Sequence, residues 1–408
     1  MASWIRFCQN GYRNYPGTQN SIFLPDPKKD KGYFLIHKTG EIIIEPEFNS
    51  FCELKYSYID ITEGNGKVIV KNRDILPGKN FVASYVTACK HKNGNDWWII
   101  QAENDTSLFY TFLLTNDTII LANIQDFDIH FDVWTSVGQA VFSPDGSKWV
   151  MYGDINSYNP GQGGCLVFDF DRASGELSNM QLIEIIDSAS ANGVAISPNS
   201  QFLYISNGYD LYQADLTVDD INSSVVHIDH WDGYADPLFG TLFGASQLAP
   251  DCKIYISCPG TNRHMHVINK PNDKGLACDF RQHAIEFPNL IYHNSITNFP
   301  HFRIDEENIC DSTITWIPDE YIVKAPMVLS VSPNPASQST NIYITSDNFE
   351  YGKIRVHDIN GNVLKVLDID SDSPLELDTS GFVPGVYVVE YVSFLSGDRD
   401  VEKLIIAE

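Results

Sequence analysis

The sequence predicts an all-β protein: a β-propeller of about five to six recognisable blades, followed by a small antiparallel β-sandwich. Three observations predict this fold class. A phrase made of a turn and a strand recurs between residues 20 and 305, helical periodicity is nearly absent, and about seven short alternating runs fill the last 82 residues. With 43% hydrophobic and 12% aromatic residues, the chain can bury a core along most of its length.

The recurring phrase is a small polar turn containing Pro or Gly, followed by a strand rich in aromatic and β-branched residues. Its copies are FLPDPKKDKGYFLIH, CKHKNGNDWWIIQ, VFSPDGSKWVMYG, AISPNSQFLYISN and QLAPDCKIYISCP. The turn positions Lys92, Ser143, Ser197 and Ala249 are separated by 51, 54 and 52 residues. This period predicts propeller blades, because a four-stranded sheet buries both of its faces only when neighbouring sheets stack on it.

The first copy is spaced differently. Pro25 precedes Lys92 by 67 residues, and the run LKYSYIDITEGNGKVIVKN fills the additional length. We expect this run to be an inserted hairpin that adds no blade.

After the repeats, the composition changes twice. We assign residues 1–304 to the propeller, the irregular acidic and Pro-containing stretch 305–326 to a linker, and 327–408 to the sandwich. Asn360 and Gly361 separate two alternating runs and give the clearest hairpin signal in the chain. Such a short module with this many strands predicts an antiparallel sandwich.

The charge balance excludes several classes of partner. The chain has 27 Lys and Arg against 53 Asp and Glu, a net charge of −26, so its field repels phosphate backbones and anionic membrane surfaces. We therefore expect no nucleic-acid partner. No run approaches the roughly 20 apolar residues of a membrane helix. The first residues, MASWIRFCQNGYRNYPG, also lack the apolar run of a secretory signal peptide.

No catalytic constellation stands out, and we predict no catalytic, cofactor-binding or metal-binding residue. His264 and His266 share one face of a strand, as paired imidazole ligands do, but we expect hydrogen-bonded structural histidines. Asp126, Asp128 and Asp132 leave calcium as a weak alternative, because the loop and terminal Glu of an EF-hand are missing.

Two further motifs admit a functional and a structural interpretation. The SPDGSKW segment lacks the spacing of a sialidase Asp-box, so we expect a β-turn that leads into a blade strand. The aromatic runs NDWWII and YSYID could stack on sugars, but packing between blades is the favoured interpretation.

The chain has eight cysteines, an even number, but a chain of this length does not need a disulfide framework to fold. Cys252 and Cys258 lie six residues apart on one strand face, too distant to bond to each other. We predict Cys278 with Cys310 as the disulfide. No pair has the two-residue separation of zinc knuckles or redox motifs, so neither metal nor thiol chemistry is indicated.

The last 82 residues resemble the C-terminal sorting domain of proteins exported by the type IX secretion system of Bacteroidetes. The resemblance lies in SVSPNPAS, KIRVHDINGNVL, LDTSGFVPGVYVVE and EKLIIAE, in that order. It implies export across both membranes, engagement of the secretion machinery, and release or surface attachment. The residues that match its motifs are Pro333, Asn334, Pro335, Gly361, Gly385, Tyr387 and Lys403.

Residues 14–303 are similar to the β-propeller of large Bacteroidetes surface proteins, in runs such as TQNSIFLPDP, HKNGNDWWII and SITNFPHFRI. The resemblance implies a propeller truncated at its start from seven blades, and a signal peptide missing from the start of this sequence. Similar sequences usually have Gly where this chain has Cys252, which makes Cys252 a doubtful disulfide partner.

These observations together predict a secreted or cell-surface protein, a monomer, whose propeller binds a glycan or a surface protein or contributes to adhesion. An enzyme is the less favoured alternative: a hydrolase acting on a polysaccharide or a lactone at the mouth of the propeller. Carboxylates or histidines that converge on the centre of the ring would favour the enzyme.

Overall fold

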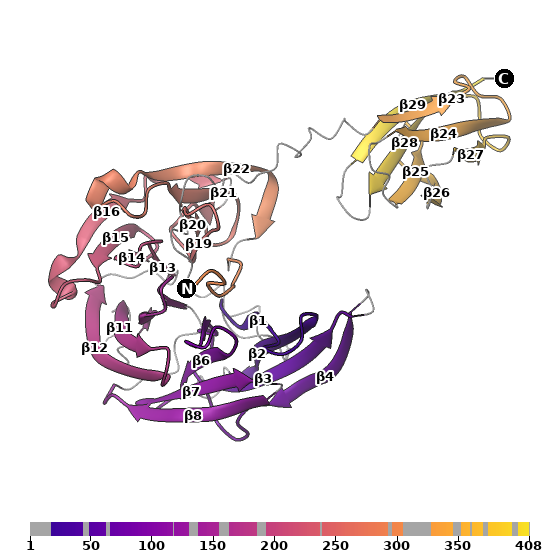
Figure 1. Cartoon of the computed structure of the whole chain (residues 1–408). Helices are drawn as coiled ribbons and strands as arrows, with labels where there is room; N and C mark the ends of the chain where they lie inside the picture. The colour runs from indigo at the N-terminus through magenta and orange to yellow at the C-terminus, as the bar shows by residue number, and fades with distance from the viewer. Residues whose placement is uncertain are drawn as a thin grey trace. The chain divides into compact units, whose positions relative to one another are not determined.

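A computed structural model of the chain contains two compact units, Met1–Asp311 and Ser312–Glu408, which divide inside the predicted linker (Figure 1). The linker, 305–326, lies outside the residues that the structure describes. Those residues are 18–43, 49–62, 66–116, 118–129, 138–154, 163–185, 193–236, 239–292, 296–304, 328–345, 352–359, 361–369, 374–393 and 399–407.

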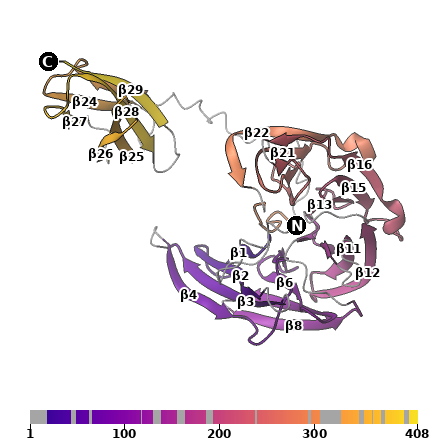
Figure 2. The same cartoon turned by 180° about the vertical axis from the view of Figure 1, so that it is seen from behind.

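The first unit is a ring of five four-stranded antiparallel sheets over the described residues, each with its strands in chain order (Figures 1 and 2). Blade 1 is β1 (Ser21–Pro25), β2 (Gly32–Ile43), β3 (Asn49–Asp60) and β4 (Lys67–Asp74). Blade 2 is β5 (Ala88–Lys90), β6 (Trp97–Ala102), β7 (Leu108–Thr115) and β8 (Thr118–Asp126). Blade 3 is β9 (Gln139–Phe142), β10 (Lys148–Asp154), β11 (Gly163–Asp171) and β12 (Glu176–Ile185).

Blade 4 is β13 (Gly193–Ile196), β14 (Phe202–Ser206), β15 (Asp210–Asp215) and β16 (Val226–His230). Blade 5 is β19 (Ser246–Leu248), β20 (Ile254–Ser257), β21 (Thr261–Ile268) and β22 (Phe280–Tyr292). A short hairpin between these two blades pairs β17 (Ala235–Asp236) with β18 (Phe239–Gly240). Two 3-10 turns, η2 (Asn222–Ser224) and η3 (Gly275–Cys278), complete the described elements of the ring. The fold confirms the predicted propeller.

The sequence period marks the same turn in successive blades. Ser143, Ser197 and Ala249 each begin the turn between the first and second strands of their blade, where their amides or carbonyls close short hydrogen-bonded loops. The run expected to be an inserted hairpin does form a hairpin, β3 with β4, and adds no blade, but it is the outer half of blade 1 and not an insertion. The longer spacing arises because β2 and β3 have 12 residues each.

Apolar clusters hold adjacent blades together. Each cluster draws side chains from two neighbouring sheets, because both faces of a blade are apolar. The largest fully buried side chains between the blades include Phe34, Trp97, Tyr110, Phe112, Phe109, Trp149, Phe168, Tyr152 and Tyr204. Burying one such side chain stabilises the fold by about 3 kcal/mol, which is why aromatic runs recur in every blade.

The segment 296–304, after blade 5, contacts the first three blades. Asn298 donates hydrogen bonds to the carbonyls of Ser21 and Val86, at 2.8 and 2.7 Å. Further along, the rings of Phe302 and Trp97 meet edge to face, and Ile304 is buried among residues of blades 2 and 3. This segment joins the end of the ring to its beginning without contributing a strand.

The second unit is a sandwich of two antiparallel sheets, as predicted. One sheet has the order β23 (Val328–Ser332), β24 (Ser339–Thr345), β27 (Leu375–Asp378). The other has the order β26 (Val363–Ile369), β25 (Gly352–His357), β28 (Gly385–Ser393), β29 (Arg399–Ile406). Alternate residues of the strands face inward, and the buried side chains Ile342, Leu377, Ile354, Val389, Tyr391 and Leu404 form the core.

Candidate functional site

The inner end of the propeller has a pocket lined by uncharged residues. This small pocket, partly open to solvent, lies where the first strands of blades 1, 3 and 5 begin. Its lining residues are Thr18, Gln19, Gln139, Ala245, Gln247, Ile296, Thr297 and Asn298. No side chain in this set can titrate, so this part of the ring offers neither a general acid nor a general base.

Two glutamines of this lining reach across the inner end of the ring and bind backbone groups on other blades. Gln19, just before β1, accepts from the amide of Ala140 in blade 3 and donates to its carbonyl, both at 2.8 Å. Gln139, in blade 3, accepts from the amides of Val194 in blade 4 and Ser246 in blade 5, at 3.1 and 3.0 Å. Its Nε2 donates to the carbonyl of Ser246. The amides therefore fasten the inner strands together across the axis.

A buried lysine fastens another part of the ring. Lys38 on β2 is fully buried, and its Nζ donates to the carbonyls of Val82 and Ser84. Burial lowers the pKa of Lys38 to about 7, because the charged form loses its hydration. An amine enclosed in this way holds the segment between β4 and β5 in place and is not accessible to a substrate.

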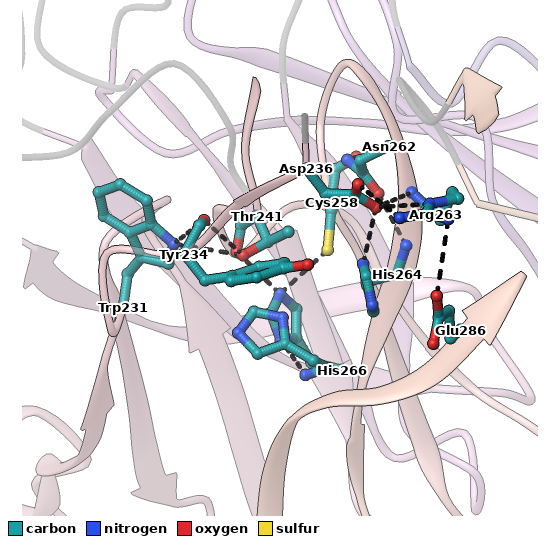
Figure 3. A network of polar contacts seen from close by, with 11 residues as sticks. Trp231, Tyr234, Asp236, Thr241, Cys258, Asn262, Arg263, His264, His266 and Glu286 are labelled. Carbon is teal, nitrogen blue, oxygen red and sulfur yellow. Dashed lines mark hydrogen bonds and ion pairs between the residues drawn. The ribbon is translucent and has the colours of Figure 1, made fainter. Parts of the chain in front are cut away.

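The two histidines that the sequence singled out lie together on β21, in a polar cluster between the β17–β18 hairpin and blade 5 (Figure 3). The side chain of His264 is buried, with Nδ1 3.0 Å from Oδ2 of Asp236. Arg263 binds the same carboxylate through Nε and Nη2, at 3.2 and 3.1 Å. These hydrogen bonds from Arg263 lower the pKa of Asp236. The ion pair anchors the hairpin to β21.

His266 is a neutral structural residue. The amide of His283 donates to its Nδ1 at 3.2 Å, so Nε2 carries the proton, which points to the carbonyl of Thr241 at 3.0 Å. Burial lowers the pKa of His266 to about 3. With both ring nitrogens engaged, the imidazole has no lone pair available for a metal ion.

Cys258 lies beside this histidine, with its Sγ 3.1 Å from Nε2 of His266. The pair resembles the nucleophile and base of a thiol enzyme in distance alone. Burial raises the pKa of Cys258 and lowers that of His266, so both groups are neutral and no thiolate forms. Among the residues that the structure describes, no group of three or more His, Cys, Asp or Glu side chains is arranged to hold a metal ion.

The other motifs are structural. Asp145 accepts from the hydroxyl of Ser143 and the amide of Ser147, in the predicted turn between β9 and β10. Trp97 and Trp98 are 1% and 3% exposed, so the NDWWII run packs inside the ring. Asp126 accepts from the amide of Asp128 at 3.0 Å in the turn after β8, and Asp132 lies outside the described residues.

The predicted disulfide between Cys278 and Cys310 is wrong. Cys278 carries a free thiol, buried at the end of η3, and burial raises its pKa. Cys252, which we expected to be a doubtful partner, is disulfide-bonded instead. It follows β19 in a turn with φ of 63°, where its side chain is partly exposed. The other described cysteines, Cys52, Cys89, Cys165, Cys258 and Cys278, carry free thiols.

The residues that match the sorting motif occupy turns and strands of the sandwich. Asn334, in the turn after β23, binds the backbone of β29: it donates to the carbonyl of Lys403 at 2.6 Å and accepts from the amide of Ile405 at 2.9 Å. Its neighbours Pro333 and Pro335 both follow cis peptide bonds.

The motif residues of the later strands are structural as well. Gly361 has φ of 83° in the turn between β25 and β26; Asn360 lies outside the described residues. Gly385 begins β28, and two residues later the ring of Tyr387 packs on Phe382 while its hydroxyl donates to the carbonyl of Val383 at 2.7 Å.

Sequence reasoning missed the residues that close and line the ring. Gln19, Gln139 and Gln247 each lie within two residues of the start of a first strand, after Thr, Gly or Ser. The recurrence of a glutamine near the start of a first strand is the sequence signal that could have identified these lining residues. Asn298 had none, because its partners, Ser21 and Val86, are more than 200 residues away.

Comparison with known proteins identifies the second unit. Residues 330–407 match the family described as the secretion system C-terminal sorting domain, which confirms the prediction for this part of the chain. A search among curated proteins finds no match to the sequence. In the part of the chain that the structure describes, no helix is long and apolar enough to cross a membrane.

Several solved structures resemble the chain at low sequence identity. PorZ, a surface component of the type-IX secretion system of Porphyromonas gingivalis, has 9% identity and a TM-score of 0.40, over 98% of this chain and 60% of its own. A functionally unknown protein of Desulfotomaculum acetoxidans has 13% identity and a TM-score of 0.39, over 86% and 84%. The NanB sialidase of Streptococcus pneumoniae has 9% identity and a TM-score of 0.35, over 67% and 56%. This chain thus spans less than two thirds of PorZ.

Proposed function

Because the chain is a β-propeller protein that ends in a secretion-system C-terminal sorting domain, we propose that its propeller is a non-catalytic binding module. The sorting domain directs the protein to export through the type IX machinery, and the propeller then meets its ligand at the cell surface or in the medium. Binding without catalysis is inferred from the polar side chains at the centre of the ring.

One observation carries the proposal: polar groups at the axis are used by the protein itself. Gln19 and Gln139 bind backbone groups of the ring through both ends of their amides. Asn298 donates to backbone carbonyls through Nδ2 and accepts from Nε2 of Gln19 through Oδ1. A catalytic centre needs polar groups that are directed at a substrate rather than at the fold. Neutral amides that already have partners support a structural axis.

The histidine cluster supports the same conclusion. A hydrolase of a polysaccharide needs two carboxyl groups on either side of the scissile bond, and a lactonase needs an activated water or a nucleophile. Asp236 is instead bound by Arg263 and His264, while His266 and Cys258 are held neutral. These side chains stabilise the hairpin between blades 4 and 5.

A secretion experiment tests the export part of the proposal. Deleting 327–408 from a version of the protein that enters the periplasm should leave the propeller folded and trapped there. The control is the intact chain, expressed at the same level and followed by cell fractionation. Secretion of the deletion variant at the intact level would contradict the role of the sorting domain.

A second experiment tests binding against catalysis. The purified full chain is incubated with cells and with a panel of polysaccharides and lactones, and both retention and product release are measured. We expect retention without product. Any release of product by the intact chain would contradict a non-catalytic module. If variants with His266 and Cys258 replaced released product equally well, the catalytic centre would lie elsewhere.

A further inference from the structure

Exposed aromatic rings gather at one corner of blade 4, although the rings elsewhere in the propeller are mostly buried. Tyr209 is 42% exposed in the turn between β14 and β15, and Trp231, which follows β16, is partly exposed. By contrast, Trp97, Trp98 and Trp149 are at most 3% exposed. Exposed aromatic residues that cluster at one place are typical of binding surfaces.

The two rings are adjacent and held in position. Their centroids are 6.0 Å apart, and the ring of Tyr209 also stacks on His230 at 6.5 Å and 21°. The indole nitrogen of Trp231 donates to the carbonyl of Tyr234 at 3.1 Å, as Figure 3 shows. The amide of Trp231 donates to the carbonyl of Tyr209 at 2.7 Å. Rings fixed in this way lose little conformational entropy when a ligand binds.

Carboxylates surround the rings. Asp210 on β15 accepts from both His230 and His227, each at 2.8 Å and each through Oδ1. Asp229 accepts from Gln282 at 3.0 Å, and the side chain of Asp232, 47% exposed, lies 3.1 Å from His283. The corner therefore presents hydrogen-bonding groups beside apolar ring faces.

A β-bulge creates this arrangement. Leu211 pairs with Asp229 and Tyr212 with His227, so Ile228 is an additional residue in β16. Ile228 is buried in the cluster between blades 4 and 5. In a regular strand, His227 and His230 would point to opposite faces; the bulge turns both toward Asp210.

We propose that this aromatic corner (Tyr209, Asp210, Asp229, His230, Trp231 and Asp232) binds a neutral polysaccharide. The C–H groups of a sugar ring stack on the electron-rich face of an aromatic ring, and the hydroxyls pair with carboxylates and imidazoles around it. This proposal rests on the proposed binding function and names its ligand class and site.

Charge decides between classes of glycan. The acidic and basic side chains of the corner are three aspartates and one histidine, besides the phenol of Tyr209, in a chain with net charge −26. Uronic or sialic acids would be repelled by these carboxylates, and their own carboxylates would lose hydration on binding. A chain of neutral hexoses or N-acetylhexosamines has no such cost.

Affinity electrophoresis of the full chain tests the proposal, with soluble glucan, mannan, xylan, galactan and chitin oligosaccharides, and with polyuronates for comparison. We expect retardation by at least one neutral polysaccharide and none by polyuronates. Tyr209→Ala and Trp231→Ala should each weaken binding by about fivefold to tenfold, the value of one stacking contact. Tyr209→Phe, which keeps the ring, should weaken binding less than Tyr209→Ala.

Phe23→Ala is the matched control, because Phe23 is 53% exposed on β1 of another blade. It should bind as the parent does. Trp231 also supports the hairpin, so thermal melting is measured for each variant, and Tyr209→Ala decides the outcome if Trp231→Ala unfolds. Failure of every neutral polysaccharide, or unchanged binding by Tyr209→Ala, overturns the proposal. If Tyr209→Ala and Trp231→Ala are both still retained on cells, the proposed binding function stands but its site lies outside the aromatic corner.

Discussion

The side chain of Asn334 accepts a hydrogen bond from the amide of Ile405 at 2.9 Å, across 71 residues of sequence. The same side chain donates to the carbonyl of Lys403, so it binds β29 as a neighbouring strand would. Two residues further, the amide of Ala336 donates to the carbonyl of Ile405 at 2.8 Å. The turn after β23 thus covers the edge of the last strand and joins the two sheets of the sandwich.

Asn334→Ala should loosen β29. Each of its two exposed hydrogen bonds contributes about 0.5–1.5 kcal/mol, so we expect a loss of about 1–3 kcal/mol in the sandwich. Hydrogen exchange of the β29 amides measures this locally, and the amide of Ile405 should lose protection first. Gln338→Ala, an exposed residue of the same connection, is the control. Unchanged protection of Ile405 in Asn334→Ala would contradict this role.

Gln139→Ala should destabilise the ring. The substitution leaves the amides of Val194 and Ser246 without their acceptor in a buried place, at a cost of about 1–3 kcal/mol for each unsatisfied group. We expect a loss of about 3 kcal/mol or more, measured by thermal or denaturant unfolding of the full chain. Gln247→Ala is the control, because Gln247 binds only its neighbour's carbonyl, that of Leu248, among the hydrogen bonds described. Equal losses in the two variants would rule out a clamp across the axis.

His266 should make stability fall as the pH is lowered. Its pKa is about 3 in the folded protein against about 6.5 when unfolded, so between these values the unfolded state binds the additional proton. Stability therefore rises with pH over this window. At pH 5 this one group costs about 2 kcal/mol relative to pH 7.

His266→Gln keeps a side-chain N–H but cannot titrate, so the difference in unfolding free energy between pH 5 and pH 7 should shrink by about that amount. His91→Gln, in the turn between β5 and β6, is the control for general effects of losing an imidazole. A pH profile of His266→Gln parallel to that of the parent would refute a buried neutral imidazole.

Disulfide mapping should find Cys252 linked and Cys278 unlinked. The full chain is unfolded without reductant, alkylated and digested, and the peptides are identified by mass spectrometry. We expect the Cys278 peptide to carry the alkyl group and the Cys252 peptide to appear only after reduction. A linked Cys278 would contradict the free thiol and restore the pairing predicted from the sequence.

The SPDG and SPNS turns show what can be predicted from a few neighbouring residues. They precede strands in successive blades because a tight turn and an apolar run are both local properties. The same reasoning failed for the first blade, where long β2 and β3 changed the spacing without changing the topology. Register and strand length depend on the partner strand, which spacing alone does not reveal.

The roles of the cysteines and histidines are set by tertiary contacts, which residue spacing does not reveal. His264 and His266 share a face, as alternation requires, but their partners Asp236, Thr241 and Cys258 come from a hairpin and a turn elsewhere in the chain. Those partners make His266 a neutral hydrogen-bond donor and place His264 beside the ion pair of Asp236 and Arg263. The aromatic corner is of the same kind, since a bulge at Ile228 brings together residues of β15 and β16.

The sequence by itself determined the class of the protein: blades from a period near 50, a sandwich from alternating runs, and a sorting domain from four ordered motifs. These follow from local preferences and hydrophobic patterning, which act over a few residues. The tertiary structure decided which polar groups remain available for a ligand. In the sequence, nothing distinguishes Gln19, Gln139 and Asn334 from an amide side chain on the surface. Their hydrogen bonds are fixed only by the strands that pack beside them.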